Sequence, residues 1–169
     1  YVIRVLDSPL ALPGADWNAL LAAQNPAEGL NPFMRHEYLA ALHPGAGLSV
    51  QPQEADFAAY LNWLHMSDAT LTFPQTLVLR YTRLEPEERR NPQVATDYRR
   101  WFAARMRCVE EATASRRYLC ADRFTIADIC VGYALVLAQS LGIDEVLTPN
   151  TQRWWQTITD RPAYKLAFE

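Results

Sequence analysis

The sequence predicts an all-α protein, a helical bundle with a short N-terminal appendage of one strand and two short helices. Three observations lead to this fold class. From Pro52 onward, apolar residues recur at the three- and four-residue spacing of amphipathic helices. Helix-starting signals lie inside this region, at Asn91-Pro92 and at Thr125. The alternating character that favours a strand is confined to residues 1–6.

The first 42 residues are expected to form the appendage. The predicted strand, residues 1–6, stops at a turn-forming Asp-Ser-Pro sequence. Short helices are expected over Asp16–Ala23 and Phe33–Leu42. The His-Pro-Gly-Ala-Gly sequence at 43–47 breaks the chain, so we place the boundary there and assign residues 43–169 to one helical domain.

Two long helices should open this domain. The first carries apolar residues at helical spacing after Pro52, namely Phe57, Tyr60, Leu61, Leu64 and Leu71. Pro74 should kink it because proline lacks the backbone donor of a regular helix. Its pattern resumes up to Glu85-Pro86. The second begins at Asn91-Pro92, where Asn caps the helix and Pro suits its first position, and ends near Ser115.

A salt bridge is predicted between these two helices. Helices joined by a short loop pack antiparallel, which brings Asp68 level with Arg105. Each falls inside the apolar stripe of its helix, where a lone charge would cost several kcal/mol. We therefore expect the two to pair. The alternative is that Asp68 faces a dimer interface or a ligand cleft.

Phe124 to Asp128 is the most informative stretch. Thr125 is suited to cap a helix, and Asp128 three residues later can reach back to its amide in a capping box. Phe124 and Ile129 stand at the positions of a hydrophobic staple. The following residues, Ile126–Ser140, are apolar nearly all round, which predicts the buried central helix of the bundle.

Composition excludes several classes of function. The net charge is −3 and no basic run alternates with aromatic residues, so we expect no nucleic-acid or anionic-membrane partner. The longest apolar run, Ile126–Ala138, is too short to span a bilayer. Three cysteines without CxxC spacing indicate reduced thiols and a cytoplasmic protein. No metal site is expected, because His36, His43 and His65 lack ligand spacing.

The order of motifs in the last third carries a family resemblance. Tyr118 to Asp128, a buried helix, Trp154-Trp155 and Arg161-Pro162-Ala163 together resemble the C-terminal domain of the glutathione transferases. Asn62-Trp63-Leu64 is similar to bacterial members, and the resemblance covers about residues 38–169. It implies a structural role for Thr125 and Asp128, whose loss should cost about 1 kcal/mol or more.

The resemblance also implies a site. In that family the first long helix and the central helix line the pocket for a small hydrophobic electrophile. Carried over by position, the wall residues would be His65, Thr72, Phe73 and Tyr133. Glutathione is the implied co-substrate, but a thioredoxin-like N-terminal half holds it and lowers its thiol pKa. We expect this chain to lack that half, and we assign no catalytic residue.

The appendage resembles a different family. Val2 to Asp7, Ala15 to Leu20 and Asn31 to Leu42 are similar to the start of FemAB-like proteins of the GNAT-like acyltransferase superfamily. They include none of that family's acyl-donor site. This resemblance implies a FemAB-like start grafted onto a transferase helical domain.

Three functions remain open from the sequence. The first is a homodimeric glutathione transferase domain that supplies the hydrophobic-substrate pocket and the dimer surface of an enzyme conjugating glutathione to small electrophiles. The second is a non-catalytic dimerisation or protein-interaction module of the same fold. The third is part of an acyltransferase, for which binding of acyl-coenzyme A would be the signature.

Overall fold

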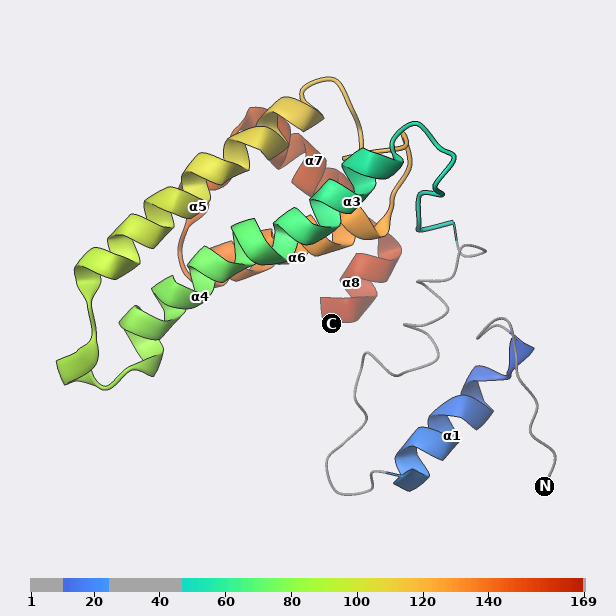
Figure 1. The fold of residues 1–169 in the computed structure, drawn as a ribbon, viewed down its shortest axis with the longest axis horizontal. Coiled ribbons are helices and arrows are strands. Elements are labelled where there is room, and N and C mark those ends of the chain that lie inside the picture. The colour runs from blue at the N-terminus through green and yellow to red at the C-terminus, as the bar shows by residue number, and fades with distance from the viewer. Residues whose placement is uncertain (1–10, 25–46, 169) are drawn as a thin grey trace. The chain divides into compact units, whose positions relative to one another are not determined.

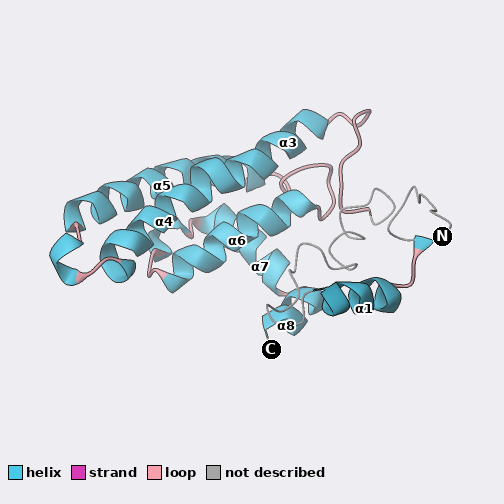
Figure 2. Cartoon of the chain, turned by 60° about the horizontal axis from the view of Figure 1, so that its bottom comes forward, coloured by secondary structure: helices cyan, strands magenta, loops and turns pink. Residues whose placement is uncertain are grey.

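The computed structural model describes residues 11–24 and 47–168, and these ranges contain helices, turns and loops but no strand (Figures 1 and 2). The all-α prediction is confirmed. The elements in chain order are α1 Gly14–Gln24, α3 Phe57–Met66, η4 Ser67–Thr72, α4 Phe73–Leu79, η5 Arg80–Leu84, η6 Glu87–Arg89, α5 Pro92–Thr113, α6 Ile126–Ser140, η7 Asp144–Val146, α7 Pro149–Thr159 and α8 Pro162–Phe168.

The chain divides into two compact units, residues 1–51 and 52–169. In the first unit, α1 corresponds to the short helix predicted from Asp16, which lies in its first turn. The predicted strand at 1–6, the predicted helix at 33–42 and the boundary after residue 42 lie outside the described residues. These remain predictions, as does the FemAB-like resemblance.

The second unit is built on a long helical hairpin. Figure 1 shows α3, η4, α4 and η5 following one another in a single irregular rod, with α5 running back beside α4. Helix α6 lies against α3 and η4, and α7 packs on both α5 and α6. Side chains of the rod reach α6 directly: the Gln75 amide donates to the Ala134 carbonyl at 3.0 Å, and Arg83 donates to the Ser140 carbonyl at 2.9 Å.

The core lies where the hairpin and α7 meet α6. Burying one large apolar side chain contributes about 1.5–3 kcal/mol, so this layer supplies much of the stability. Close packing of α7 on α6 depends on Gly132, where an added Cβ would lie 3.2 Å from the Trp155 ring. The largest fully buried apolar side chains are Leu71, Phe102, Val109, Leu119, Val131, Leu135, Ile143 and Trp154.

Helix α6 has the predicted bounds but is not buried on every side. Its inner face includes Asp128 and Leu135, both without exposed area. Ile129 and Tyr133, one helical turn apart, are 45% and 58% exposed. Neighbouring helices cover one side of α6, and its outer apolar stripe is left open. The Arg161 guanidinium lies over the Phe124 ring, 3.7 Å from its centroid, and the staple between Phe124 and Ile129 stays a prediction.

Two wide turns make the first rod irregular. Ser67–Thr72 and Arg80–Leu84 are π-helical, and the Glu85 amide donates to the Arg80 carbonyl at 2.9 Å. The first wide turn ends at Thr72, two residues before Pro74. A proline ring clashes with the carbonyl four residues earlier in a regular helix, and a π-turn relieves that clash. The predicted kink therefore takes the form of a widened turn.

The predicted Asp68–Arg105 salt bridge is wrong. Both side chains are exposed, and no ion pair joins them in the described part of the chain. Ser67, not Asp68, occupies the buried position of the first rod. Arg105 lies over the exposed Trp101 ring, 4.4 Å from its centroid. The predicted stripe ran through Leu61 and Leu64 to Asp68, but Leu61 is 37% exposed. The buried stripe is the neighbouring one, which contains Tyr60, Trp63, Ser67 and Leu71.

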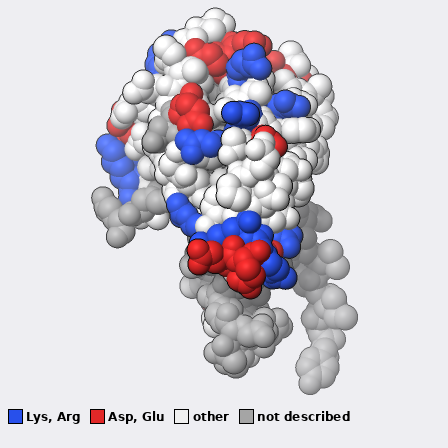
Figure 3. Space-filling view, turned by 90° about the vertical axis from the view of Figure 1, so that its left-hand side faces the viewer, with Lys and Arg blue, Asp and Glu red and all other residues white. Residues whose placement is uncertain are grey.

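Helix α5 begins as the sequence predicts. The Asn91 side chain accepts a hydrogen bond from the Val94 amide at 3.2 Å, and Pro92 stands at the first helical position. At the hairpin end, Glu85 pairs with Arg80 and Arg89, each at 2.7 Å. Figure 3 shows acidic and basic side chains interspersed on this end of the molecule. The charges at the hairpin end thus compensate one another.

The start of α7 is capped by a residue of α5. The Glu110 carboxylate accepts hydrogen bonds from the Asn150 amide at 3.2 Å, the Thr151 amide at 2.8 Å and the Thr148 hydroxyl at 2.5 Å. Desolvation alone would raise the pKa of Glu110, but these hydrogen bonds outweigh it and lower the pKa to about 2. The cap therefore joins α5 to the first turn of α7.

Candidate functional site

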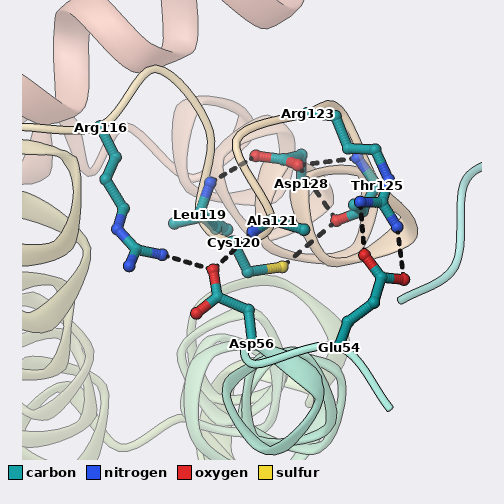
Figure 4. Close-up of polar contacts among 9 residues, drawn as sticks. All are labelled: Glu54, Asp56, Arg116, Leu119, Cys120, Ala121, Arg123, Thr125 and Asp128. Atoms are coloured by element: carbon teal, nitrogen blue, oxygen red, sulfur yellow. Dashed lines mark hydrogen bonds and ion pairs between the residues drawn. The ribbon is translucent and has the colours of Figure 1, made fainter. Parts of the chain in front are cut away.

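Asp128 is the centre of a buried hydrogen-bond network (Figure 4). Its Oδ2 accepts from the Thr125 amide at 2.9 Å and from the Thr125 hydroxyl at 3.2 Å. Its Oδ1 accepts from the Leu119 amide at 3.0 Å and from the Trp154 indole at 2.9 Å. Burial raises the pKa of Asp128, while these hydrogen bonds act in the opposite direction. One carboxylate thus joins the start of α6, the loop before it, and α7.

The loop between α5 and α6 is also tied to the start of α3. Arg116 pairs with Asp56 at 2.8 Å, and the Ala121 amide donates to the same carboxylate oxygen at 2.7 Å (Figure 4). The Ala121 amide and then the Arg116 guanidinium lower the pKa of Asp56. Arg123 grips Glu54 through two nitrogens, at 2.7 and 2.8 Å. These contacts fix the loop on two sides.

The hydrogen bonds of this network hold elements of the fold together. Its carboxylates are occupied by backbone amides, the Trp154 indole or arginines, which leaves none placed as a general base. Cys120 is buried beside the Thr125 hydroxyl at 3.6 Å, and burial raises the pKa of its thiol. Burial likewise raises the pKa of Cys108 and Cys130. Reactive thiols need the opposite shift, so none of these cysteines is activated.

The four wall residues proposed from the sequence lie on neighbouring elements. His65 near the end of α3 is exposed, and Thr72 at the end of η4 is half-buried with its hydroxyl donating to the Ser67 carbonyl at 2.7 Å. Phe73 at the start of α4 is 55% exposed, and Tyr133 lies on the open stripe of α6. No hydrogen bond or ring contact of the described residues links two of these four.

Sequence reasoning missed one member of the open stripe. Ile129 precedes Tyr133 by one turn of α6 and shares its exposure. The helical spacing of these two residues was a signal for a common face, but the apolar character of the whole helix concealed which face stayed open.

Within residues 11–24 and 47–168, no three His, Cys, Asp or Glu side chains are grouped to hold a metal ion. No helix in this part of the chain has the length and apolar character needed to cross a bilayer.

Residues 75–162, just over half of the chain, match the family described as the glutathione S-transferase C-terminal domain. The chain belongs to this glutathione S-transferase family. Helices α5, α6 and α7 lie wholly inside the matched range, and so does the Asp128 network apart from its ties to Asp56 and Glu54. The family resemblance inferred from these motifs is confirmed.

Individual transferases are similar over a larger part of the chain. Glutathione S-transferase GstB of Escherichia coli K12 is 25% identical over 167 residues, which cover 90% of this chain and 79% of GstB. The transferase Ure2p5 of Phanerochaete chrysosporium, crystallised with 1-(S-glutathionyl)-2,4-dinitrobenzene, superposes with a TM-score of 0.66 at 21% identity over 78% of this chain. BphK, a bacterial transferase in a ternary complex, gives a TM-score of 0.65 at 19% identity over 82% of this chain.

These solved structures establish the fold of the helical domain. The chain covers 63% of the Ure2p5 chain and 66% of the BphK chain, less than two-thirds of either.

Proposed function

We propose that this helical domain supplies the hydrophobic-substrate wall of an enzyme that conjugates glutathione to small electrophiles. The observation that carries the proposal is the open apolar stripe of α6, Ile129 and Tyr133, in a domain of the transferase family. Phe73 adds a second exposed aromatic ring on the adjoining rod. Such rings suit a flat aromatic electrophile, because stacking adds to the free energy of area burial.

The helical domain does not activate glutathione under this proposal, and a thioredoxin-like half does. A thiol near pKa 8.5 needs a hydrogen-bond donor or a positive field to ionise at neutral pH. Among the four wall residues, His65, Thr72 and Tyr133 carry a side-chain donor, and the Thr72 hydroxyl is already bound to the Ser67 carbonyl. A thioredoxin-like half would provide the thiolate site, in the same polypeptide or in a partner.

A dimer surface is proposed on the outer face of α5. Trp101 is 51% exposed, and its ring stacks on the Tyr98 ring with centroids 6.2 Å apart. The Arg105 guanidinium also lies over the Trp101 ring. Trp, Tyr and Arg are the residues most enriched in the energetic centres of protein interfaces. A second copy of this chain would bury this group.

The second candidate is a non-catalytic interaction module of the same fold. It is favoured by the Asp128 network, whose polar groups are all committed to holding the bundle together. A module of this kind would dimerise through Trp101 without binding an electrophile at α6.

Titration with 1-(S-glutathionyl)-2,4-dinitrobenzene, followed calorimetrically on the full chain, separates the two candidates. Under the wall proposal the conjugate binds saturably, and Phe73→Ala or Tyr133→Ala weakens binding about fivefold to tenfold, the equivalent of about 1 kcal/mol of lost ring contact. Leu166→Ala on α8, a still more exposed apolar residue, is the control and should leave affinity unchanged. Absence of binding, or equal losses in all three variants, would favour the interaction module.

A further inference from the structure

A pocket of about 350 Å³ opens at the end of α5, away from the residues assigned to the electrophile wall. It lies between the segment that follows α5 and helix α7. Its lining contains three arginines and no carboxylate, from the set Ala114, Ser115, Arg116, Arg117, Arg153, Trp154 and Thr157.

Two of the three arginines form hydrogen bonds within the fold and still have unused N–H donors. Arg153 donates to the Thr113 and Ala114 carbonyls and so caps the end of α5, and its other terminal nitrogen donates to Asn150 at 3.0 Å. Arg116 uses one terminal nitrogen on Asp56 at 2.8 Å. A guanidinium has five N–H donors, so both retain unused donors.

For Arg117, the third arginine, the contact within the fold is with an aromatic ring. Its guanidinium lies over the Tyr118 ring, 5.4 Å from the centroid, and among the described residues it forms no ion pair. It is exposed and lines the same pocket as Arg116 and Arg153. Arg116 is paired with Asp56, so Arg117 and Arg153 are the two cations of this hollow without an ion pair among the described residues. They repel one another unless an anion enters.

We infer that this pocket binds a small molecule bearing a phosphate group. A planar carboxylate can be satisfied by one guanidinium fork, whereas a tetrahedral phosphate with two charges presents oxygens to donors that arrive from several directions. The Ser115 hydroxyl on the pocket wall offers a further donor. The volume of 350 Å³ leaves room for an organic body attached to the phosphate.

The Trp154 indole provides a reporter for occupancy. Trp154 lines the pocket, and its indole N–H donates to Asp128 at 2.9 Å. A ligand that moves Arg153 or Trp154 should therefore shift the NMR resonance of the Trp154 indole N–H. The test is an ¹H–¹⁵N titration of the full chain with inorganic phosphate at constant ionic strength. Saturable shifts of the Trp154 indole are expected, with phosphate binding at least tenfold tighter than acetate.

Arg117→Gln should weaken phosphate binding about tenfold, the equivalent of about 1.4 kcal/mol for one charged hydrogen-bond donor. Arg107→Gln is the matched control, since Arg107 is an exposed arginine of α5 that does not line the pocket. The phosphate affinity of this variant should equal that of the unmodified chain. The inference is overturned by non-saturable shifts, by acetate binding as tightly as phosphate, or by equal effects of the two substitutions.

Discussion

At the scale of single residues, the four donors that converge on Asp128 decide what this side chain can be. The Thr125 amide and hydroxyl, the Leu119 amide and the Trp154 indole all donate, so each oxygen of residue 128 must accept. Asn fits this site poorly although its shape is nearly the same, because its NH₂ group would face two donors. A buried donor that loses its partner costs about 1–3 kcal/mol.

Asp128→Asn should therefore lower the free energy of unfolding by about 2 kcal/mol or more, measured by urea denaturation. Asp68→Asn is the control. Asp68 is exposed and unpaired with Arg105, so its replacement should change stability by less than about 0.5 kcal/mol. Equal losses in the two variants would contradict the central place given to Asp128.

The sequence pattern predicts only the local contact of this network, the one between Thr125 and Asp128. The Thr125–Asp128 spacing predicts a contact within one helical turn, and the structure has that contact. The bonds from Leu119 and Trp154 span 9 and 26 positions and depend on how α7 and the loop pack. No periodicity in the sequence encodes such long-range partners, so they could not be read from it.

At the scale of elements, α7 depends on a carboxylate that belongs to α5. The pKa of Glu110 is lowered from 4.5 to about 2, so the folded state favours the ionised form. Its contribution to stability is fully present above pH 4.5 and is lost as the pH falls towards 2. Because the group is close to solvent, we expect a contribution of about 1 kcal/mol.

The pH dependence of a Glu110→Gln variant checks this cap. At neutral pH the variant should unfold about 1 kcal/mol more easily than the unmodified chain, and the difference should shrink as the pH falls from 4.5 towards 2. Glu111→Gln, at the next position of the same helix, serves as control. A difference that stayed constant over this pH range would show that ionisation of Glu110 contributes nothing.

Elements differ in how far their sequences reveal them. Helices α5 and α6 begin where their capping residues predict, because a cap is a local signal. The two π-turns of the first rod escaped detection, since apolar spacing tolerates one extra residue. The misplacement of Asp68 has another cause, because Tyr60, Trp63, Ser67 and Leu71 are buried at regular helical spacing whereas the predicted stripe followed the exposed Leu61.

At the scale of the whole molecule, self-association is expected to involve the outer face of α5. Trp101→Glu would place a charge at the centre of that face and should convert a dimer into a monomer, as measured by sedimentation equilibrium. Leu84→Glu, at the hairpin end, replaces a residue of still greater exposure and should leave the dimer intact. A dimer that persists in Trp101→Glu would move the interface elsewhere.

The family of the helical domain could be predicted from the order of motifs in its last third, but the exposed face on which the substrate wall is proposed could not. Tyr133 was proposed by analogy alone, and its exposure became apparent only when the neighbours of α6 were placed. The arginine pocket joins the end of α5 to α7 through residues about 40 positions apart. Sequence spacing gives no indication of such a meeting.

The division of labour proposed for this domain, an electrophile wall without a thiol-activating site, is tested most directly by the rate of conjugation. The full chain is mixed with glutathione and 1-chloro-2,4-dinitrobenzene at neutral pH, and the absorbance of the conjugate is followed as the chain concentration is raised. We expect the rate to remain that of buffer at every concentration, even where the conjugate itself binds. A rate that rises in proportion to the chain concentration would contradict the proposal, because it would require a group in this chain that ionises the glutathione thiol.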